Sequence, residues 1–236
     1  MKKQMLFILL FGWATSHAQQ KNEAEDRLRN DWAYLKKYED ANMKLDMPKP
    51  GESRVVFFGN SITEGWKIVD SAFFKKKPYV NRGISGQTTS QMLVRFKPDV
   101  IDLKPKLVVI LAGTNDIAGN TGPTKLETIM GNLASMAQLA RANGIRVVLS
   151  SVLPVFDYPW KPGLQPAEKI VSLNKMIKDF AHAHNMVYLD YYSSMVDERK
   201  GLKKELGNDG VHPNLAGYRV MGPLAEQAIA LALKQK

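Results

Sequence analysis

Short apolar runs alternate with amphipathic helical patterns along most of the chain, and this alternation constrains the fold more than any other feature. The runs are rich in Val, Ile, Leu and Phe, as in strands that are buried on both faces of a sheet. We expect strands at residues 54–58, 79–81, 106–111, 145–152 and 186–190. Helical patterns fill the intervals, at residues 88–103 with a break near Pro98, 124–143, 166–184, and 214–233 with a bend or a fresh start at Pro223. This order predicts an α/β fold, a doubly wound parallel sheet with helices on both faces.

Residues 1–18 have the three-part layout of a secretory signal peptide. Two lysines stand near the start, an unbroken apolar run covers residues 5–13, and a Ser-His-Ala cleavage site precedes Gln19. The alternative is a short membrane anchor, but the run is shorter than the roughly 18 apolar residues that a spanning helix needs. A lipid-modified terminus is not expected, because the chain has 0 Cys. We therefore expect export, to a periplasmic or extracellular location.

Residues 19–50 form a charged segment with a helical pattern between about residues 22 and 44. Its apolar residues recur at three- and four-residue steps, at Leu28, Trp32, Leu35, Tyr38, Ala41 and Leu45. Such a stripe docks a helix onto a core. We expect this N-terminal helical segment to pack on the body of a single domain, residues 51–236. The alternative is that it caps the functional site.

Charge and composition narrow the classes of partner. The chain has 33 Lys and Arg against 23 Asp and Glu, a net charge of +10, but its densest basic run is only residues 75–77. Scattered lysines indicate a solvated surface, so we expect no nucleic-acid partner. No stable membrane insertion is expected after cleavage. The absence of cysteine excludes disulfides and Cys-based zinc sites. The oligomeric state is not predicted.

A serine follows the first expected strand in the motif FGNSITEGW, residues 58–66. A Ser that leaves a buried strand through a Gly just before a helix exposes its hydroxyl at the rim of the sheet, beside the unpaired N–H groups of the helix. The motif is not the Gly-x-Ser-x-Gly elbow of α/β-hydrolases, because Thr63 occupies the place of the second glycine. The alternative is that Ser61 is an ordinary N-cap.

A carboxylate and an imidazole stand three residues apart in DGVHPNLAGY, which begins at Asp209. A serine hydroxyl needs a base to take its proton, and the base needs a carboxylate that orients it. His212 is the only good candidate base after residue 18, because His182 and His184 lie on a predicted helix where we expect them to be solvated. A metal site would need further ligands, which the other histidines do not supply.

Two further motifs follow strands, GISGQTT at residues 83–89 and LAGTNDI at residues 111–117. Gly86 offers a bare backbone N–H, and Asn115 carries an amide that can donate to an oxyanion. Each motif alone is also a simple turn. Together with the two motifs above, they fall where one crevice can gather them.

These four blocks resemble, in order, those of the SGNH (GDSL) hydrolase superfamily, and the chain looks most similar to the platelet-activating-factor acetylhydrolase catalytic subunits and bacterial GDSL-type acyl hydrolases. The resemblance implies that Ser61 is the nucleophile, with Asp209 and His212 as partners. It implies an oxyanion hole made by the backbone N–H groups of Ser61 and Gly86 and by the Asn115 side chain. It also implies a flavodoxin-like α/β/α sandwich with a five-stranded parallel sheet, and neither cofactor nor metal.

The chain departs from the family at Asn60, where the first block commonly has Asp, which puts the local charge in doubt. We expect an exported serine ester hydrolase that cleaves short acyl esters, acetyl foremost, plausibly on carbohydrates. Trp66, Tyr158 and Trp160 are the expected substrate contacts, either on sugar faces or along an acyl groove. The alternatives are a lysophospholipase or thioesterase for longer chains, and a non-catalytic glycan-binding protein. The loop at residues 154–166 is either a pocket wall or a packed surface loop.

Overall fold

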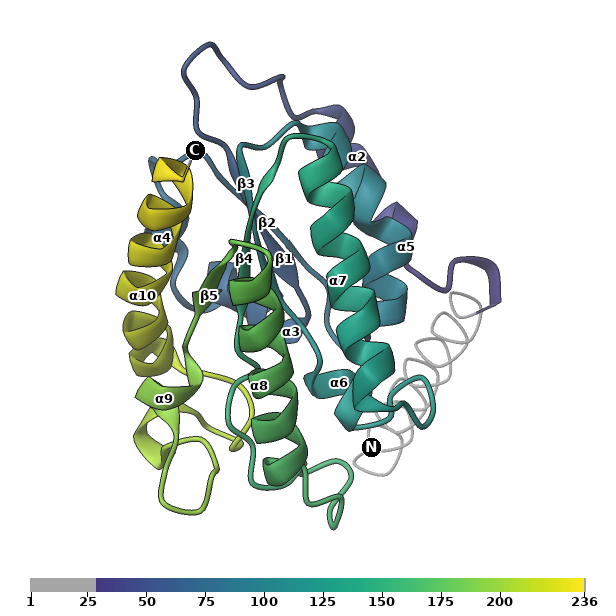
Figure 1. Cartoon of the computed structure of the whole chain (residues 1–236), viewed down its shortest axis with the longest axis vertical. Helices are drawn as coiled ribbons and strands as arrows, with labels where there is room; N and C mark the ends of the chain where they lie inside the picture. The colour runs from purple at the N-terminus through teal and green to yellow at the C-terminus, as the bar shows by residue number, and fades with distance from the viewer. Residues whose placement is uncertain (1–28, 236) are drawn as a thin grey trace, which may run out of the picture.

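The computed structural model, which describes residues 29–235, has one parallel sheet with the strand order β2-β1-β3-β4-β5 (Figure 1). Its strands are β1 (Val55–Gly59), β2 (Tyr79–Gly83), β3 (Leu107–Leu111), β4 (Arg146–Ser150) and β5 (Val187–Leu189). All neighbouring strands pair in parallel. The five expected strands and the flavodoxin-like order are confirmed.

Helices cover both faces of the sheet, as Figure 1 shows. One face carries α5 (Thr89–Asp99), α7 (Leu126–Ala142) and α8 (Ala167–Ala183). The other carries α3 (Ser61–Val69), α4 (Ser71–Phe74), α9 (Tyr192–Met195) and α10 (Leu215–Lys234). Shorter pieces are α6 (Thr114–Ile117), η2 (Ile101–Leu103) and η3 (Lys204–Leu206).

Strand β1 shows how the sequence builds two cores. Val55 and Phe57 belong to the hydrophobic cluster under α3 and α10, whereas Val56 and Phe58 belong to the cluster under α5, α7 and α8. Successive side chains of a strand point to opposite faces, so a continuous apolar run buries one residue in each core by turns. The result is the three-layer sandwich that the alternation predicts.

The N-terminal segment is not the single helix that its apolar spacing predicts. Among the described residues, 29 and 30 are helical, and a turn with a left-handed Tyr34 (φ 54° and ψ 50°) separates them from η1 (Leu35–Tyr38) and α2 (Glu39–Met43). A left-handed residue stops a right-handed helix. The predicted stripe also fails, since Trp32 and Leu35 are exposed, while Ala33, which it omits, is buried. The predicted signal peptide and Leu28 lie outside the described residues.

The two prolines of the predicted helices have different outcomes. The expected break near Pro98 is confirmed, because α5 ends at Asp99 and η2 follows at Ile101–Leu103. Helix α10 continues through Pro223, so no fresh start occurs there. A proline inside a helix loses one hydrogen bond. In α10 that loss is offset because Met221 and Ala225, on either side of Pro223, are fully buried in the core.

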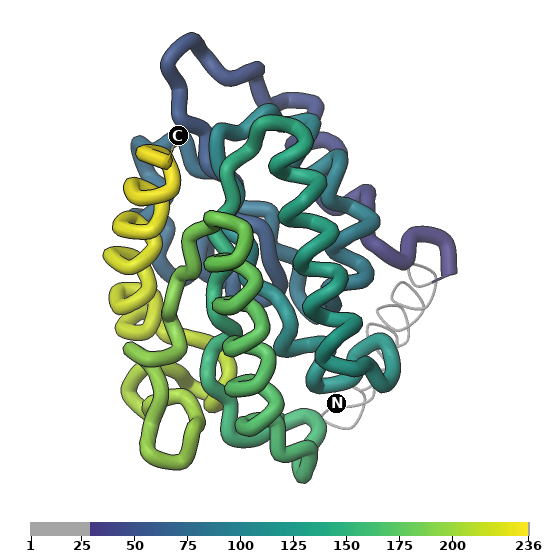
Figure 2. Tube along the Cα trace, viewed as in Figure 1, coloured from purple at the N-terminus to yellow at the C-terminus, as the bar shows by residue number. Residues whose placement is uncertain are grey.

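The carboxyl ends of the strands all lie on one edge of the sheet, where α/β folds bind ligands. The strand order reverses at β1, whose neighbours are β2 and β3, and the blocks containing Ser61, Gly86 and Asn115 follow these three strands directly. Residues 29–43 run beside α5 (Figure 2). Within residues 29–235, no helix combines the length and the apolar character that crossing a membrane requires.

Candidate active site

Ser61 is the first residue of α3, directly after the end of β1. The N-cap is Asn60, not Ser61, because the Asn60 side chain accepts a hydrogen bond from the Ile62 N–H at 3.1 Å. Asn serves as an N-cap as well as Asp does, which explains how the helix start tolerates this departure from the family pattern. Capping by Asn60 leaves the Ser61 hydroxyl available for chemistry.

The three predicted partners form one hydrogen-bonded chain. Ser61 Oγ lies 2.9 Å from Nε2 of His212, and Nδ1 of the same ring lies 2.6 Å from Oδ2 of Asp209. A proton on Nδ1 is held by the carboxylate, so Nε2 is left to accept the serine proton. The Tyr218 hydroxyl donates to the Ile62 carbonyl at 2.8 Å and so ties the start of α10 to the start of α3.

Asp209 also organises the loop that carries His212. Its Oδ1 accepts the backbone N–H of His212 at 2.7 Å and that of Val211 at 2.9 Å. Partial burial raises the pKa of Asp209, but the hydrogen bonds from the His212 backbone, the His212 ring and the Val211 backbone outweigh it and leave this pKa below its ordinary value. The carboxylate is therefore ionised at neutral pH and able to orient the imidazole.

Two of the three predicted oxyanion groups lie on adjoining segments, Gly86 on the loop after β2 and Asn115 in α6. Gly86 has φ +77°, a conformation that L side chains rarely adopt. The Asn115 side chain is buried, and its Nδ2 donates to the Gln87 carbonyl at 2.9 Å. An amide has two N–H bonds, so this contact orients the group while one N–H stays available for a substrate oxygen. Residues 86, 87 and 115 are thus linked directly.

The Gly86 loop is supported by side chains that sequence reasoning missed. The Glu64 carboxylate accepts the Ser85 N–H at 2.8 Å and the Ser85 hydroxyl at 2.5 Å, and it pairs with Lys37 at 3.0 Å. Arg95, fully buried, donates to the carbonyls of Gly59 at 2.9 Å and Arg82 at 3.0 Å. Glu64 stands three residues after Ser61, a helical spacing that puts both on one side of α3 and is the only sequence signal for it.

The N-terminal segment contacts the same loop from outside. Gln87 Nε2 donates to the Ala33 carbonyl at 2.6 Å, and Gln91 Nε2 donates to the Trp32 carbonyl at 2.8 Å. The Tyr38 hydroxyl donates to the Gly83 carbonyl at 2.5 Å. Burial, with the nearby Glu64 charge adding to it, raises the pKa of Tyr38 to about 12, so the hydroxyl stays a donor. This segment is joined to the loop by polar contacts rather than by an apolar stripe.

Two of the three predicted aromatic contacts are wrong. Trp66 is buried between Phe73 and Tyr218, with ring centroids 4.5 and 5.4 Å away, and Tyr158 is buried with its hydroxyl donating to the Thr114 carbonyl at 2.8 Å. The spacing of Ile62 and Trp66, one turn of helix apart, is the signal that places Trp66 on the core side of α3. Both rings are closed to a ligand.

Trp160 is the exception among these aromatics. It is 47% exposed, and its ring centroid lies 6.0 Å from that of His212. Of the aromatic residues in the loop at residues 154–166, Tyr158 is buried, whereas Phe156 and Trp160 are exposed. Lys161 Nζ donates to the Ala118 carbonyl at 2.9 Å and fastens this loop beside the Asn115 block.

Asp116, next to Asn115, is a buried acid whose carboxylate is closed to solvent. Its carboxylate accepts the Thr89 N–H at 3.0 Å and the Thr89 hydroxyl at 2.6 Å, which caps the start of α5. Burial raises the pKa of Asp116 to about 6, although the Thr89 hydrogen bonds oppose the shift.

Histidines and acids elsewhere do not form a metal centre in the described part of the chain. His182 and His184 are exposed, as predicted. No group of three or more His, Asp or Glu side chains within residues 29–235 lies close enough to hold a metal ion. The groups that meet at the site are a serine, an imidazole and a carboxylate, with neighbouring N–H donors.

Similarity to known proteins covers this whole constellation. The model of the GDSL-like lipase/acylhydrolase family matches residues 57–220. Esterase TesA of Pseudomonas aeruginosa is 30% identical over 171 residues, which cover 70% of this chain and 78% of that protein. The uncharacterized lipoprotein YqeF of Bacillus subtilis is 33% identical over 125 residues, 45% of this chain but only 51% of that protein. The crystal structure of a GDSL-like lipase from Bacteroides thetaiotaomicron is 48% identical with a TM-score of 0.84, and the match covers 86% of this chain and 100% of that one.

Proposed function

This chain belongs to the GDSL-like lipase/acylhydrolase family of ester hydrolases, and on that premise we propose that it is an exported serine esterase that removes short acyl groups, acetyl first, from carbohydrates. The observation that carries the proposal is the contact chain from Ser61 Oγ through His212 to Asp209, with distances of 2.9 and 2.6 Å. An ordinary helix start needs no imidazole there.

In the proposed mechanism, His212 takes the proton from Ser61 Oγ while that oxygen attacks the ester carbonyl carbon. The carbonyl oxygen becomes an oxyanion, which the N–H groups of Ser61 and Gly86 and the Asn115 amide stabilise. The C–O bond to the alcohol then breaks, and the alcohol leaves with the proton from His212. Water repeats the sequence on the acyl-enzyme, releasing the acid and restoring the Ser61 hydroxyl.

The surroundings of His212 support a carbohydrate as the alcohol. The leaving oxygen must come close to Nε2 to receive its proton, and the exposed face of Trp160 lies beside that ring. The C–H face of a pyranose packs well on an indole, while its hydroxyls stay in water. An aliphatic acyl groove would need a continuous apolar wall, and this loop instead exposes Trp160 between Pro159 and Lys161.

We place the mature protein outside the cytoplasm on the pattern of residues 1–18, with a signal peptide before Gln19, a segment at 19–50 and one hydrolase domain at 51–236. The match to the YqeF lipoprotein is consistent with export. Mass spectrometry of protein recovered from the periplasm or medium tests this directly, since cleavage makes Gln19 the first residue.

Hydrolysis of p-nitrophenyl esters from acetate to palmitate tests the activity. We expect the highest kcat/KM on acetate or propionate and expect Ser61→Ala to lower it by about 10³-fold or more without loss of folding. Ser172→Ala, on an exposed position of α8, is the matched control and keeps wild-type rates. Full activity of the Ser61 variant contradicts the serine mechanism, whereas a maximum at long chains contradicts the short-acyl assignment and favours a lysophospholipase or thioesterase.

A further inference from the structure

We propose that the turn Trp32-Ala33-Tyr34 of the N-terminal segment forms, with the Gly86 loop, a second sugar-binding subsite for an acylated oligosaccharide. This inference deepens the proposed function and depends on it. Trp32 and Tyr34 lie outside the four sequence blocks and outside the family match at residues 57–220.

A cavity of about 250 Å³ lies between this turn and the Gly86 loop. Trp32 and Tyr34 form one wall, and the Gly86 and Gln87 segment forms another. Asn120 and Thr121 supply polar groups, and the buried Gln91 completes the lining. This volume is slightly below that of pockets for drug-sized ligands, which suits one sugar ring rather than a long acyl chain.

The chemistry of the lining matches a pyranose. Trp32 is 41% exposed, so it offers an indole face to the cavity rim. The Asn120 amide and the Thr121 hydroxyl, on exposed residues of the lining, can donate to and accept from sugar hydroxyls. A single wall residue, Ile84, is aliphatic, so the apolar surface of the cavity is mainly that of the two aromatic rings.

The aromatic turn is held rigidly in place, as expected for a binding element. Asp31 accepts the N–H groups of Leu35 at 2.7 Å and Lys36 at 3.0 Å, and its carbonyl accepts the Tyr34 N–H at 2.8 Å. The left-handed backbone of Tyr34 carries a strain that non-glycine residues accept only where their surroundings impose it, and such residues cluster at ligand sites.

Two buried glutamines donate amide N–H groups to this turn. Gln87 and Gln91 donate to the carbonyls of Ala33 and Trp32, at 2.6 and 2.8 Å, and both are themselves buried. The same Gln87 accepts Asn115 Nδ2 through its backbone carbonyl. The cavity is therefore fixed relative to the proposed oxyanion groups, as a subsite for a neighbouring sugar must be.

The subsite and Trp160 lie against different parts of the site. Trp160 stands beside His212, where the leaving alcohol is protonated, whereas Trp32 stands beside Gly86. An oligosaccharide that carries its acyl group on one sugar reaches both, and a monosaccharide ester reaches only one. The subsite therefore predicts a preference for oligosaccharides that depends on Trp32.

The test compares full-length wild type with Trp32→Ala on p-nitrophenyl acetate and on two sugar series. One series is acetylated xylose with acetylated xylooligosaccharides, and the other is acetylated glucose with acetylated cello-oligosaccharides. We expect the wild type to prefer the oligosaccharides and expect Trp32→Ala to lower that preference by about tenfold, through KM. Trp32→Phe, which keeps an aromatic face, restores most of it. Leu35→Ala is the matched control, because Leu35 is 43% exposed on the same segment but does not line the cavity.

Three results overturn the subsite. These are an equal loss on all substrates with Trp32→Ala, a preference that Trp32→Ala leaves intact, and a wild type that favours no oligosaccharide over its monosaccharide in either series. Each of these leaves the serine esterase assignment standing as long as Ser61→Ala abolishes hydrolysis of p-nitrophenyl acetate. Activity that survives Ser61→Ala contradicts the proposed function instead.

Discussion

Glu64 is the side chain whose replacement should separate support of the proposed oxyanion loop from the chemistry itself. Its carboxylate holds Ser85, the residue before Gly86, through a backbone N–H at 2.8 Å and a hydroxyl at 2.5 Å, and it pairs with Lys37 at 3.0 Å. Both Ser85 hydrogen bonds reach Oε2 of Glu64, whereas Lys37 Nζ lies beside Oε1. In Glu64→Gln an amide oxygen at the Oε2 position still accepts both bonds, but it is neutral and accepts them more weakly. The NH₂ group takes the Oε1 position and cannot pair with Lys37.

The magnitude follows from what is lost. A hydrogen bond to a charged group contributes about 1.5 to 3 kcal/mol, and a partly exposed ion pair adds about 0 to 1 kcal/mol. Gln retains part of the first contribution, so we expect the loop to lose about 1.4 kcal/mol of ordering, which converts to about tenfold in kcat. KM should change little, because a misplaced Gly86 N–H weakens binding of the oxyanion more than binding of the ground-state carbonyl.

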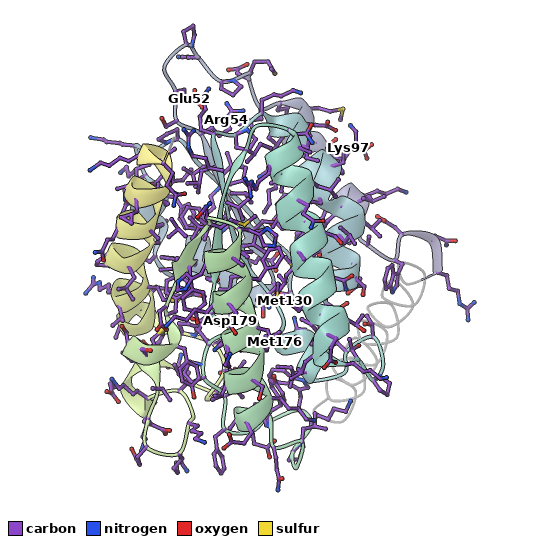
Figure 3. The ribbon with its side chains drawn as sticks, in the orientation of Figure 1. Glu52, Arg54, Lys97, Met130, Met176 and Asp179 are labelled. Atoms are coloured by element: carbon purple, nitrogen blue, oxygen red, sulfur yellow. The ribbon has the colours of Figure 1, made fainter. Side chains whose placement is uncertain are left out.

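The chain offers a matched control at the opposite edge of the sheet. Glu52 has the same exposed side-chain fraction as Glu64, 21%, and it too accepts a backbone N–H and pairs with a cation, Arg54, at 3.0 Å. Figure 3 labels Glu52 and Arg54 together at one end of the molecule, before the start of β1. Glu52→Gln removes the same charge far from the site and should leave kcat at the wild-type value.

Initial rates on p-nitrophenyl acetate over a range of concentrations give kcat and KM for the wild type and for each variant. Ser85→Ala, which deletes the hydroxyl and keeps the backbone bond, should fall between wild type and Glu64→Gln. Equal kcat values for Glu64→Gln and Glu52→Gln refute the reasoning. So does a Glu64→Gln effect that falls mainly on KM, because the carboxylate would then serve substrate binding.

Two further predictions concern the buried pair that follows β3. Asn115→Ala should lower kcat by about 10² to 10³-fold with a small change in KM, as loss of an oxyanion donor does, and a change mainly in KM would assign Asn115 to ground-state binding. Burial raises the pKa of Asp116 from 3.8 to about 6, so the folded state binds the extra proton between these values and the free energy of unfolding falls as pH rises through them, by about 3 kcal/mol in all. Urea unfolding from pH about 4 to about 7 measures how the free energy of unfolding depends on pH. We expect Asp116→Asn to flatten this dependence, and an unchanged dependence in that variant would contradict the assignment to Asp116.

The sheet is predictable from the sequence because each strand is a short apolar run, which can be recognised from a few consecutive residues. Nearly every side chain of residues 107–111 and 146–150 is buried. The apolar pattern of each run therefore predicts its burial without knowledge of the segments that pack on it. The N-terminal segment shows the opposite case. Its three- and four-residue apolar spacing indicates one helix, but the Asp31 cap and the left-handed Tyr34 interrupt it. Contacts with Gln87 and Gln91, remote in the chain, decide that conformation.

The predicted aromatic contacts failed for a related reason. For an aromatic residue near a site motif, the sequence does not indicate whether the side chain faces a ligand or the core. Trp66 lies on the same helix as Ser61 but on the face turned toward Phe73 and Tyr218, and Tyr158 turns inward to hold Thr114. The four-residue spacing of Ile62 and Trp66 indicates that both lie on the same face of the helix. This indication can be used only when the helix is known to begin at Ser61.

The parts of the candidate site also differ in how far away their supports lie along the chain. Asp209 reaches His212 across three residues, so its pairing is readable from a short motif. Glu64 reaches Ser85 across 21 residues, and Gln87 reaches Ala33 across 54. Because we propose that the blocks carry the chemistry and that the distant segment carries the sugar subsite, we expect that relatives can keep the four blocks while changing residues 31–38. Differences in substrate preference among such relatives should therefore track the residue at position 32 more closely than any residue within the blocks.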